Sequence, residues 1–192
     1  VTNADEAFEA AKQFGNFTSL FNDFKVENLK ETIPQFHDLN YRFLQFCDAI
    51  VTANDSRINI AKTEIKYLLE HEKILLQFND LVSKNYLIQR VTHHDTKISN
   101  VLFDQSNKAI AVIDLDTVMS GFFISDVGDM MRTYLSPLNE EVTNFNDIYI
   151  RKDILLAIKE GYLFCMKKYL NANEVDSFNF SGAYIIYMQA LR

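Results

Sequence analysis

The sequence has few of the residues that interrupt regular structure. Its 192 residues include only five glycines and two prolines, with two cysteines and no tryptophan. So little glycine and proline leaves little room for linkers, and the sequence shows neither a low-complexity segment nor an internal repeat. With 48% hydrophobic residues, a chain of this length can bury a substantial core. A single domain over residues 1–192 is therefore predicted.

Two further absences narrow the class of protein. No run of about eighteen apolar residues exists, which argues against a membrane span. The residues from Val1 to Glu6 have neither the basic nor the apolar region of a signal peptide. Cys47 and Cys165 are too far apart for a close metal-ligand spacing. We expect a cytoplasmic protein with two buried, reduced thiols, and a single disulfide is the alternative.

The chain also lacks an excess of positive charge. Its formal net charge is −7, from 19 Lys and Arg against 26 Asp and Glu. Non-specific nucleic-acid binding depends on a basic surface that displaces counterions, so no nucleic-acid partner is predicted. An anionic nucleotide is still compatible with this charge, because Mg²⁺ and one or two cations can offset phosphate locally.

Helical periodicity covers most of the chain. Sixteen Phe and nine Tyr indicate an aromatic-rich core, and five of the Phe follow one helical face near the start. A loop is expected around Pro34, and Asp55 or Ser56 is expected to cap a long helix. Asp126 is expected to cap another. The predicted helices cover residues 5–24, 40–51, 56–82, 126–134, 152–170 and 175–191.

One segment has strand character. Val101–Phe103 and Ala109–Ile113 are short apolar runs separated by the turn-rich residues Asp104–Lys108, which indicates a β-hairpin. The predicted fold is therefore mainly α (α+β), with many helices around one small hairpin.

Polar residues suited to phosphoryl transfer flank this hairpin. Asp95 is followed five residues later by Asn100, with Lys97 between them, and Asp114 follows the second strand. Phosphoryl transfer with a Mg-nucleotide needs a carboxylate that positions the hydroxyl nucleophile and oxygen ligands that hold Mg²⁺. Because an antiparallel hairpin returns the chain to its starting side, Asn100 and Asp114 are expected to lie together.

The motif His93-x-Asp95-x-Lys97-x-x-Asn100, followed by Ile113-Asp114, resembles the catalytic loop and metal segment of protein-kinase-like phosphotransferases. It is most similar to their small-molecule branch, the superfamily of aminoglycoside phosphotransferases and choline kinases. Within that branch several runs resemble the N-acetylhexosamine 1-kinase group. These runs are residues 32–37, 92–97, 100–104, 114–119 and 126–132. Ser99 and Ser120 depart from the Asn and Pro expected in that group.

The resemblance implies a role for each residue of the motif. Asp95 would be the catalytic carboxylate, and Lys97 would neutralise charge on the transferred phosphate. Asn100 and Asp114 would bind Mg²⁺ and, through it, ATP. Asp116 would be an additional or outer metal ligand, with a solvated loop carboxylate as the alternative. The alternatives for the others are a turn-capping Asp95, a surface Lys97 and a strand-end Asp114.

Other residues would support the loop or the acceptor. The resemblance implies that His93 and Asp126 brace the catalytic loop. For Asp129 and Arg132, one helical turn apart, an intrahelical ion pair is the alternative to substrate contact. The residues implied to contact the substrate are Thr32, His37, Arg42 and Arg132.

The resemblance extends over nearly the whole chain but only as the helical C-terminal lobe. No glycine-rich strand loop and no strand-rich region precede His93, although kinase-like enzymes need them to grip ATP. We therefore expect a fragment lacking the N-terminal lobe and the extreme C-terminus, with little or no activity alone.

The implied parent is an ATP- and Mg²⁺-dependent kinase of a small metabolite. The first candidate acceptor is an N-acetylhexosamine, phosphorylated at its anomeric hydroxyl; choline, ethanolamine, homoserine or an aminoglycoside are alternatives. A noncatalytic binding module with the same fold is a further alternative, as is an all-helical scaffold in which the motif is accidental and Asp114 lies far from Asn100.

Overall fold

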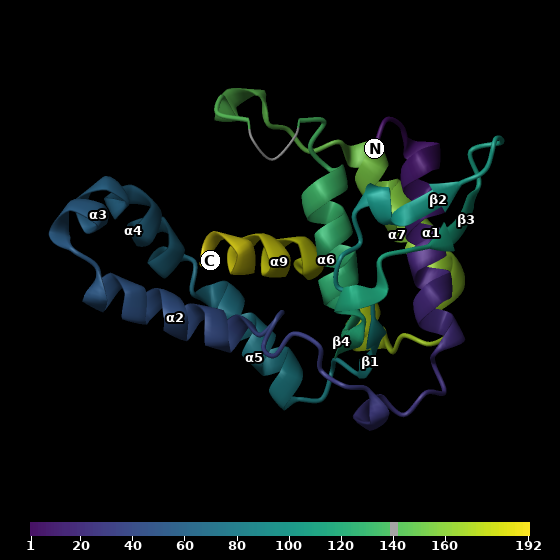
Figure 1. The fold of residues 1–192 in the computed structure, drawn as a ribbon, viewed down its shortest axis with the longest axis horizontal. Coiled ribbons are helices and arrows are strands. Elements are labelled where there is room, and N and C mark those ends of the chain that lie inside the picture. The colour runs from purple at the N-terminus through teal and green to yellow at the C-terminus, as the bar shows by residue number, and fades with distance from the viewer. Residues whose placement is uncertain (139–141) are drawn as a thin grey trace.

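The computed structural model describes residues 1–138 and 142–192, and it confirms a mainly helical fold (Figure 1). The helices are α1 (Ala4–Leu20), α2 (Leu39–Thr52), α3 (Asp55–Ile60), α4 (Lys62–Glu70), α5 (Lys73–Ser83), α6 (Phe123–Tyr134), α7 (Lys152–Met166), α8 (Ala172–Asp176) and α9 (Phe180–Ala190). The strands are β1 (Gln89–Thr92), β2 (Val101–Phe103), β3 (Ala109–Val112) and β4 (Met119–Phe122). Single 3₁₀ turns are η1 (Val26–Asn28), η2 (Ile98–Asn100), η3 (Leu115–Thr117) and η4 (Phe145–Asp147).

The core lies where α1 packs on α7 and α6 packs on α9. Phe14, Tyr134 and Tyr162 are fully buried within it. The first contact is a close backbone approach, because a Cβ on Gly15 would lie 2.8 Å from the carbonyl oxygen of Tyr162. A glycine in the middle of α1 is destabilising on its own, but here only glycine lets the two helices come together.

Several helices end earlier than their periodicity predicts. The first ends at Leu20 rather than at residue 24, and Phe21 and Phe24 are 39% and 43% exposed. The helix predicted over 152–170 ends at Met166. The segment predicted as one helix over 175–191 is divided into α8 and α9. A capping box between Asn171 and Glu174 starts α8.

The long helix predicted over 56–82 is wrong. The chain forms α3, α4 and α5 instead, with breaks at Ala61 and His71, where ψ is 13° at both positions. The N-cap is Asn54, whose side chain accepts a hydrogen bond from the Arg57 N–H, and neither Asp55 nor Ser56 has that role.

Burial explains why this segment bends. In Figure 1, α3 and α4 extend away from the body of the molecule, on the side opposite the β2–β3 hairpin. Ile60 is 82% exposed and Leu69 45% exposed. The chain turns back at α5, which places Leu75 and Phe78 in the core. A straight helix of that length would carry α5 away from the core, so tertiary packing overrides the local periodicity.

The structure contains two small antiparallel sheets. The predicted hairpin is present as β2 and β3, with Val101 opposite Val112. The second sheet was not predicted. It pairs β1 with β4 and places Thr92 opposite Met119. The residues just before the catalytic motif and those just after it are therefore paired with each other.

Within residues 1–138 and 142–192, no helix is long and apolar enough to cross a membrane. Cys47 and Cys165 do not form a disulfide, as expected. Both are half-buried rather than buried.

Candidate active site

The base of the β2–β3 hairpin brings the two halves of the motif together. The Ile113 N–H donates to the carbonyl oxygen of Asn100 at 2.9 Å. Asp114 follows directly, in a left-handed conformation with φ 61° and ψ 65°. Asp tolerates this conformation better than most residues, and it turns the chain sharply out of the strand. The backbones of Asn100 and Asp114 are therefore neighbours, as the hairpin predicted.

Asn100 also contacts Asp95. Its Nδ2 donates to the carbonyl oxygen of Asp95 at 2.9 Å and to the carboxylate Oδ2 at 3.1 Å. Both partners are acceptors, so the amide nitrogen must be the atom that faces them. This orientation leaves the amide oxygen of Asn100 available to a ligand.

Lys97 lies beside the same carboxylate. Its Nζ is 3.4 Å from Asp95 Oδ1, and the Lys97 side chain is 47% exposed. The Asp95 side chain is 26% exposed, which leaves part of the carboxylate accessible to a small molecule. The two oxygens of Asp95 thus have different neighbours, an amide on one side and an ammonium on the other.

The His93 ring connects the candidate catalytic loop (residues 93–100) to the candidate metal segment (residues 113–116). Its Nε2 is 3.0 Å from the carbonyl oxygen of Ile113, and its Nδ1 accepts from the Asp95 N–H at 3.3 Å. A carbonyl cannot donate, so Nε2 carries the proton and the ring is neutral. The rings of Phe14 and Phe17 pack edge-on against it. These contacts suit the bracing role that the sequence predicted.

Asp126 holds the backbone of the loop in place. Its two carboxylate oxygens accept from the backbone N–H groups of His93 at 2.9 Å and His94 at 2.7 Å. Asp126 is fully buried. The prediction that it caps its helix is wrong, because α6 begins at Phe123 and Phe122 is the N-cap. Asp126 therefore lies in the first turn of α6, with its carboxylate committed to the loop.

Asp129, a second acidic residue of α6, binds the loop at Thr96. This role was not predicted from the sequence. Asp129 accepts from the Thr96 N–H at 2.8 Å and from the Thr96 hydroxyl at 3.3 Å. Burial raises the pKa of Asp129, and Arg132 opposes that shift. Tyr134 donates its hydroxyl to the carbonyl oxygen of Thr96 at 2.6 Å. The three-residue spacing of Asp126 and Asp129 on one helix face could have indicated this pair.

The candidate substrate residues fall in different places. Thr32 donates to the carbonyl oxygen of Asp116 at 3.0 Å, and His37 lies 2.9 Å from His94. Arg42 donates to Gln45 and to the carbonyl oxygens of residues 35 and 36, so it braces its own loop. Arg132 donates to Asp129 through Nε and Nη2, the ion pair left open as the alternative.

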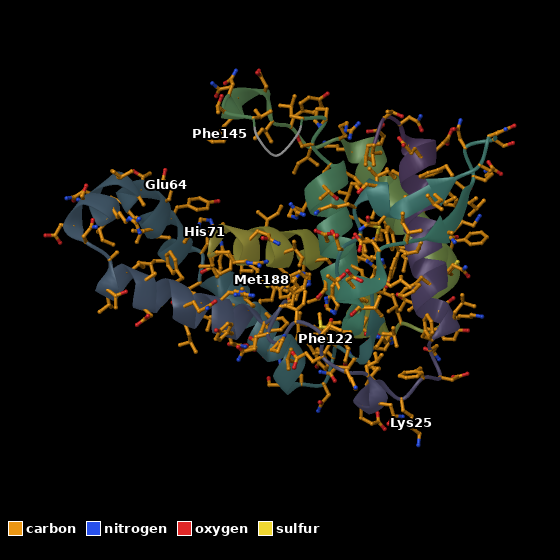
Figure 2. The ribbon with its side chains drawn as sticks, in the orientation of Figure 1. Lys25, Glu64, His71, Phe122, Phe145 and Met188 are labelled. Carbon is orange, nitrogen blue, oxygen red and sulfur yellow. The ribbon has the colours of Figure 1, made fainter. Side chains whose placement is uncertain are left out.

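A cavity of about 340 Å³ lies next to the catalytic loop. It is lined by the loop of residues 31–40, by α5 and by β4, including Phe122, which Figure 2 labels. Its polar side chains include Gln35, His37, Gln89, His94 and Ser120. His94, the residue before Asp95 in the sequence, lines this cavity, whereas Asp95 itself is not one of its lining residues.

The donor atoms in this region suit a hard cation. In the described part of the chain, no three His, Cys, Asp or Glu side chains form a metal-binding group. The available set is the amide oxygen of Asn100 and the carboxylate of Asp114. Two protein oxygens are enough for Mg²⁺, which usually keeps several waters and binds substrate phosphates for the rest. Asp116 is exposed, with its backbone carbonyl held by Thr32.

A helical lobe whose hairpin base gathers Asp95, Asn100 and Asp114 is typical of phosphoryl-transfer proteins. Comparison with known families agrees with this class. Residues 3–156 match the model of APH, the phosphotransferase enzyme family, and the chain belongs to this family. The matched segment contains the catalytic loop, the hairpin and α6.

Proposed function

We propose that this chain supplies the acceptor-binding and catalytic lobe of an ATP- and Mg²⁺-dependent kinase of a small hydroxylated metabolite. Asp95 accepts a hydrogen bond from the acceptor hydroxyl and orients it toward the γ-phosphate. Asn100 and Asp114 hold Mg²⁺, which offsets the charge on the phosphates. Lys97 adds a positive charge beside the transferred group.

The observation that carries this proposal is the arrangement of Asn100. Its side-chain amide nitrogen donates to Asp95, and its backbone carbonyl oxygen accepts from the N–H of Ile113, the residue before Asp114. Asn100 is therefore tied to the nucleophile-orienting carboxylate through its side chain and to the segment of the second metal ligand through its backbone. An accidental motif would not require this juxtaposition, and a noncatalytic module would not need to keep it.

The cavity chemistry supports an N-acetylhexosamine as the acceptor. Its volume of about 340 Å³ lies at the small end of ligand pockets, which span roughly 300–1,000 Å³. Amides, hydroxyls and imidazoles line it together with aromatic rings, a combination that binds neutral hydroxylated molecules.

Each of the two carboxylates at the cavity has one oxygen bound to a backbone N–H. Glu31 accepts from the Gln35 N–H at 3.0 Å, and Asp38 caps α2 by accepting from the Tyr41 N–H at 3.0 Å. A cationic acceptor such as choline, ethanolamine or an aminoglycoside would need such groups for itself. Homoserine would need a further site for its carboxylate. These acceptors are the alternatives within the same reaction class.

We also propose that a nucleotide-covering lobe outside these 192 residues grips ATP. The described residues before β1 form helices and loops, with no strand there to carry a phosphate-covering loop. The chain by itself should therefore bind ATP weakly. Calorimetric titration of ATP and Mg²⁺ into this chain and into the full-length protein would test this, and equal affinities would contradict it.

The acceptor is tested with a panel of N-acetylhexosamines, unmodified hexoses, choline, ethanolamine, homoserine and an aminoglycoside. Acceptor-dependent ADP release is measured with the full-length protein and its Asp95→Asn variant. We expect release with an N-acetylhexosamine and a product that has lost its reducing end, since phosphorylation blocks the anomeric carbon. Release with an amino alcohol alone would reassign the acceptor. No release with any acceptor, despite tight sugar binding, would favour the noncatalytic module.

A further inference from the structure

Two histidines, the half-buried His37 and the buried His94, join the loop of residues 31–38 to the catalytic loop. His37 Nδ1 lies 2.9 Å from His94 Nδ1, and His94 Nε2 lies 2.7 Å from the Thr92 hydroxyl. The family resemblance implies no role for His94 and gives His37 only as a candidate substrate contact. Yet His94 is the residue immediately before Asp95, and it is only 5% exposed.

The hydrogen bonds run from His37 through His94 to Thr92. The bond made by Thr92 fixes where each proton lies. The Thr92 hydroxyl lies 3.2 Å from the carbonyl oxygen of Met119, which can only accept, so Thr92 donates to it. Thr92 then accepts from His94 Nε2–H. This leaves a lone pair on His94 Nδ1, which accepts from His37 Nδ1–H. Both rings are neutral in this arrangement, and each hydrogen bond has one donor and one acceptor.

The backbone of His94 is held in an uncommon conformation. Its φ is 67°, in the left-handed region that few residues other than glycine adopt without cost. Such strain persists only where neighbours hold it. Here Asp126 binds the His94 N–H, and the space beside the ring is filled: a Cβ on Gly121 would lie 2.5 Å from His94 Cε1. Its neighbours thus hold the His94 ring in place. His37 contacts the ring on the side of the cavity.

His37 is also held in place by its own neighbours. Its ring stacks on Phe36 with centroids 4.5 Å apart, and its carbonyl oxygen accepts from the Tyr184 hydroxyl at 2.7 Å. Tyr184 belongs to α9, so His37 connects α9, through its backbone carbonyl, to the catalytic loop, through its imidazole.

We propose that His37 is a positioning residue for phosphoryl transfer: through the ring of His94 it holds the backbone that carries Asp95, and it ties the cavity loop to the catalytic loop. This rests on the proposed function, because it assumes that Asp95 acts on an acceptor bound in that cavity. Displacing a reacting group by about 1 Å can cost roughly 100-fold in rate, so a contact of this kind has a large effect on turnover.

The connection is sensitive to acid. One added proton puts a buried positive charge at the pair, where Arg42 of α2, Arg132 of α6 and Arg192 after α9 face His37. Around His94, the charge of Asp126 favours protonation and His93 opposes it. A second proton leaves two N–H donors facing each other, which breaks the contact. Burial lowers the pKa of His37 well below its usual 6.5 and lowers that of His94 too.

The direction of the pH effect follows. Because the folded pair takes up protons less readily than the unfolded chain, the stability that the neutral pair contributes is present above the ordinary histidine pKa of 6.5 and is lost as pH falls below it. The contact within the folded protein is lost only when the pH reaches the lowered pKa values of the pair. The two rings titrate as a coupled pair, so a single-residue pKa does not describe them.

Two substitutions at one position test the role. His37→Asn places an amide donor where Nδ1–H lies but cannot be protonated. His37→Phe keeps a flat ring on Phe36 but removes the donor. In the full-length enzyme we expect His37→Phe to lower kcat about 10- to 100-fold, with acceptor KM within about threefold of wild type. His37→Asn should restore most of kcat and remove the acid limb that this pair contributes to the pH–kcat profile.

His71→Gln is the matched control, because His71 lies at the end of α4 and its ring bonds to the Tyr67 carbonyl oxygen and stacks on the Tyr67 ring, with no hydrogen bond or ring contact to His37 or His94 among the described residues. It should leave kcat, KM and the pH profile unchanged. A rise in acceptor KM without loss of kcat in His37→Phe would overturn the proposal, since it would make His37 a simple acceptor contact. An unchanged acid limb in His37→Asn would overturn it as well.

A readout independent of catalysis separates this proposal from the proposed function. Histidine ring NMR signals of the chain are followed from pH 8 to pH 4. We expect two rings to titrate together below the usual range, and His37→Asn to change the titration of His94 but not of His71. If no acceptor is phosphorylated but this coupling is seen, the proposed function fails while the link stands. Independent titration of the two rings would overturn the link itself.

Discussion

The side-chain amide of Asn100 donates to the carboxylate of Asp95, five positions earlier in the sequence, at 3.1 Å. This bond joins the residue proposed to orient the acceptor to a residue proposed to bind Mg²⁺. The backbone carbonyl oxygen of Asn100 also accepts from the residue that precedes Asp114. A substitution at Asp95, Asn100 or Asp114 should therefore alter the geometry of the other two.

Asp95→Asn should lower kcat of the full-length protein about 100- to 10,000-fold with little change in acceptor KM, because positioned carboxylates contribute that much to proton transfer. Steady-state kinetics measure it, and the melting temperature should stay near wild type. An activity within about threefold of wild type would exclude Asp95 as the catalytic carboxylate.

Asp114→Asn should raise the Mg²⁺ concentration needed for half-maximal activity, since it removes one charge from the metal site. Asn is the better substitution than Ala because it also accepts the left-handed conformation at φ 61°. Activity is measured across a Mg²⁺ series, with Asp116→Asn as the comparison. An equal effect at Asp116 would make that residue a metal ligand as well.

Asp126→Asn should destabilise the fold by about 3 kcal/mol. The carboxylate accepts from two buried backbone N–H groups, and hydrogen bonds to charged groups contribute roughly 1.5–3 kcal/mol each. An amide can satisfy only one of them through its oxygen. Urea unfolding measures the change. Asp48→Asn, on the exposed face of α2, is the control and should change stability by less than about 0.5 kcal/mol.

Glu174→Gln should cost about 3–5 kcal/mol of stability, because it leaves the Arg90 guanidinium buried without a balancing charge. The two side chains form a two-pronged ion pair, and Arg90 and Glu174 are 6% and 0% exposed. Arg90→Met should cost a similar amount. In the double variant the two losses should not add, because each single change already breaks the same pair.

The surface ion pair of Lys84 and Asp80 is the matched control, since both side chains are about half exposed. Lys84→Ala should leave thermal unfolding unchanged within error. If Glu174→Gln proved equally silent, the Arg90–Glu174 pair would not anchor β1 to α8.

Sequence by itself predicted the parts of the site that are local. The spacing of Asp95 and Asn100, and the hairpin that returns the chain to Asp114, depend on neighbouring residues and on strand alternation, so both could be deduced in advance. Helices α1, α2, α6 and α7 were recognisable for the same reason, although Phe21 and Phe24 continued the apolar spacing beyond the point where α1 has a surface to cover.

Tertiary structure decided what depends on partners far along the chain. The pairing of β1 with β4 joins residues that are 27 apart at Thr92 and Met119, and Arg90 meets Glu174 across 84 residues. The bend that divides residues 55–83 into three helices has no glycine or proline to mark it, because burial of Leu75 and Phe78 imposes it. The contact of His37 with His94 is of the same kind. Local pattern fixes which residues carry the chemistry, while only packing fixes what holds them in place.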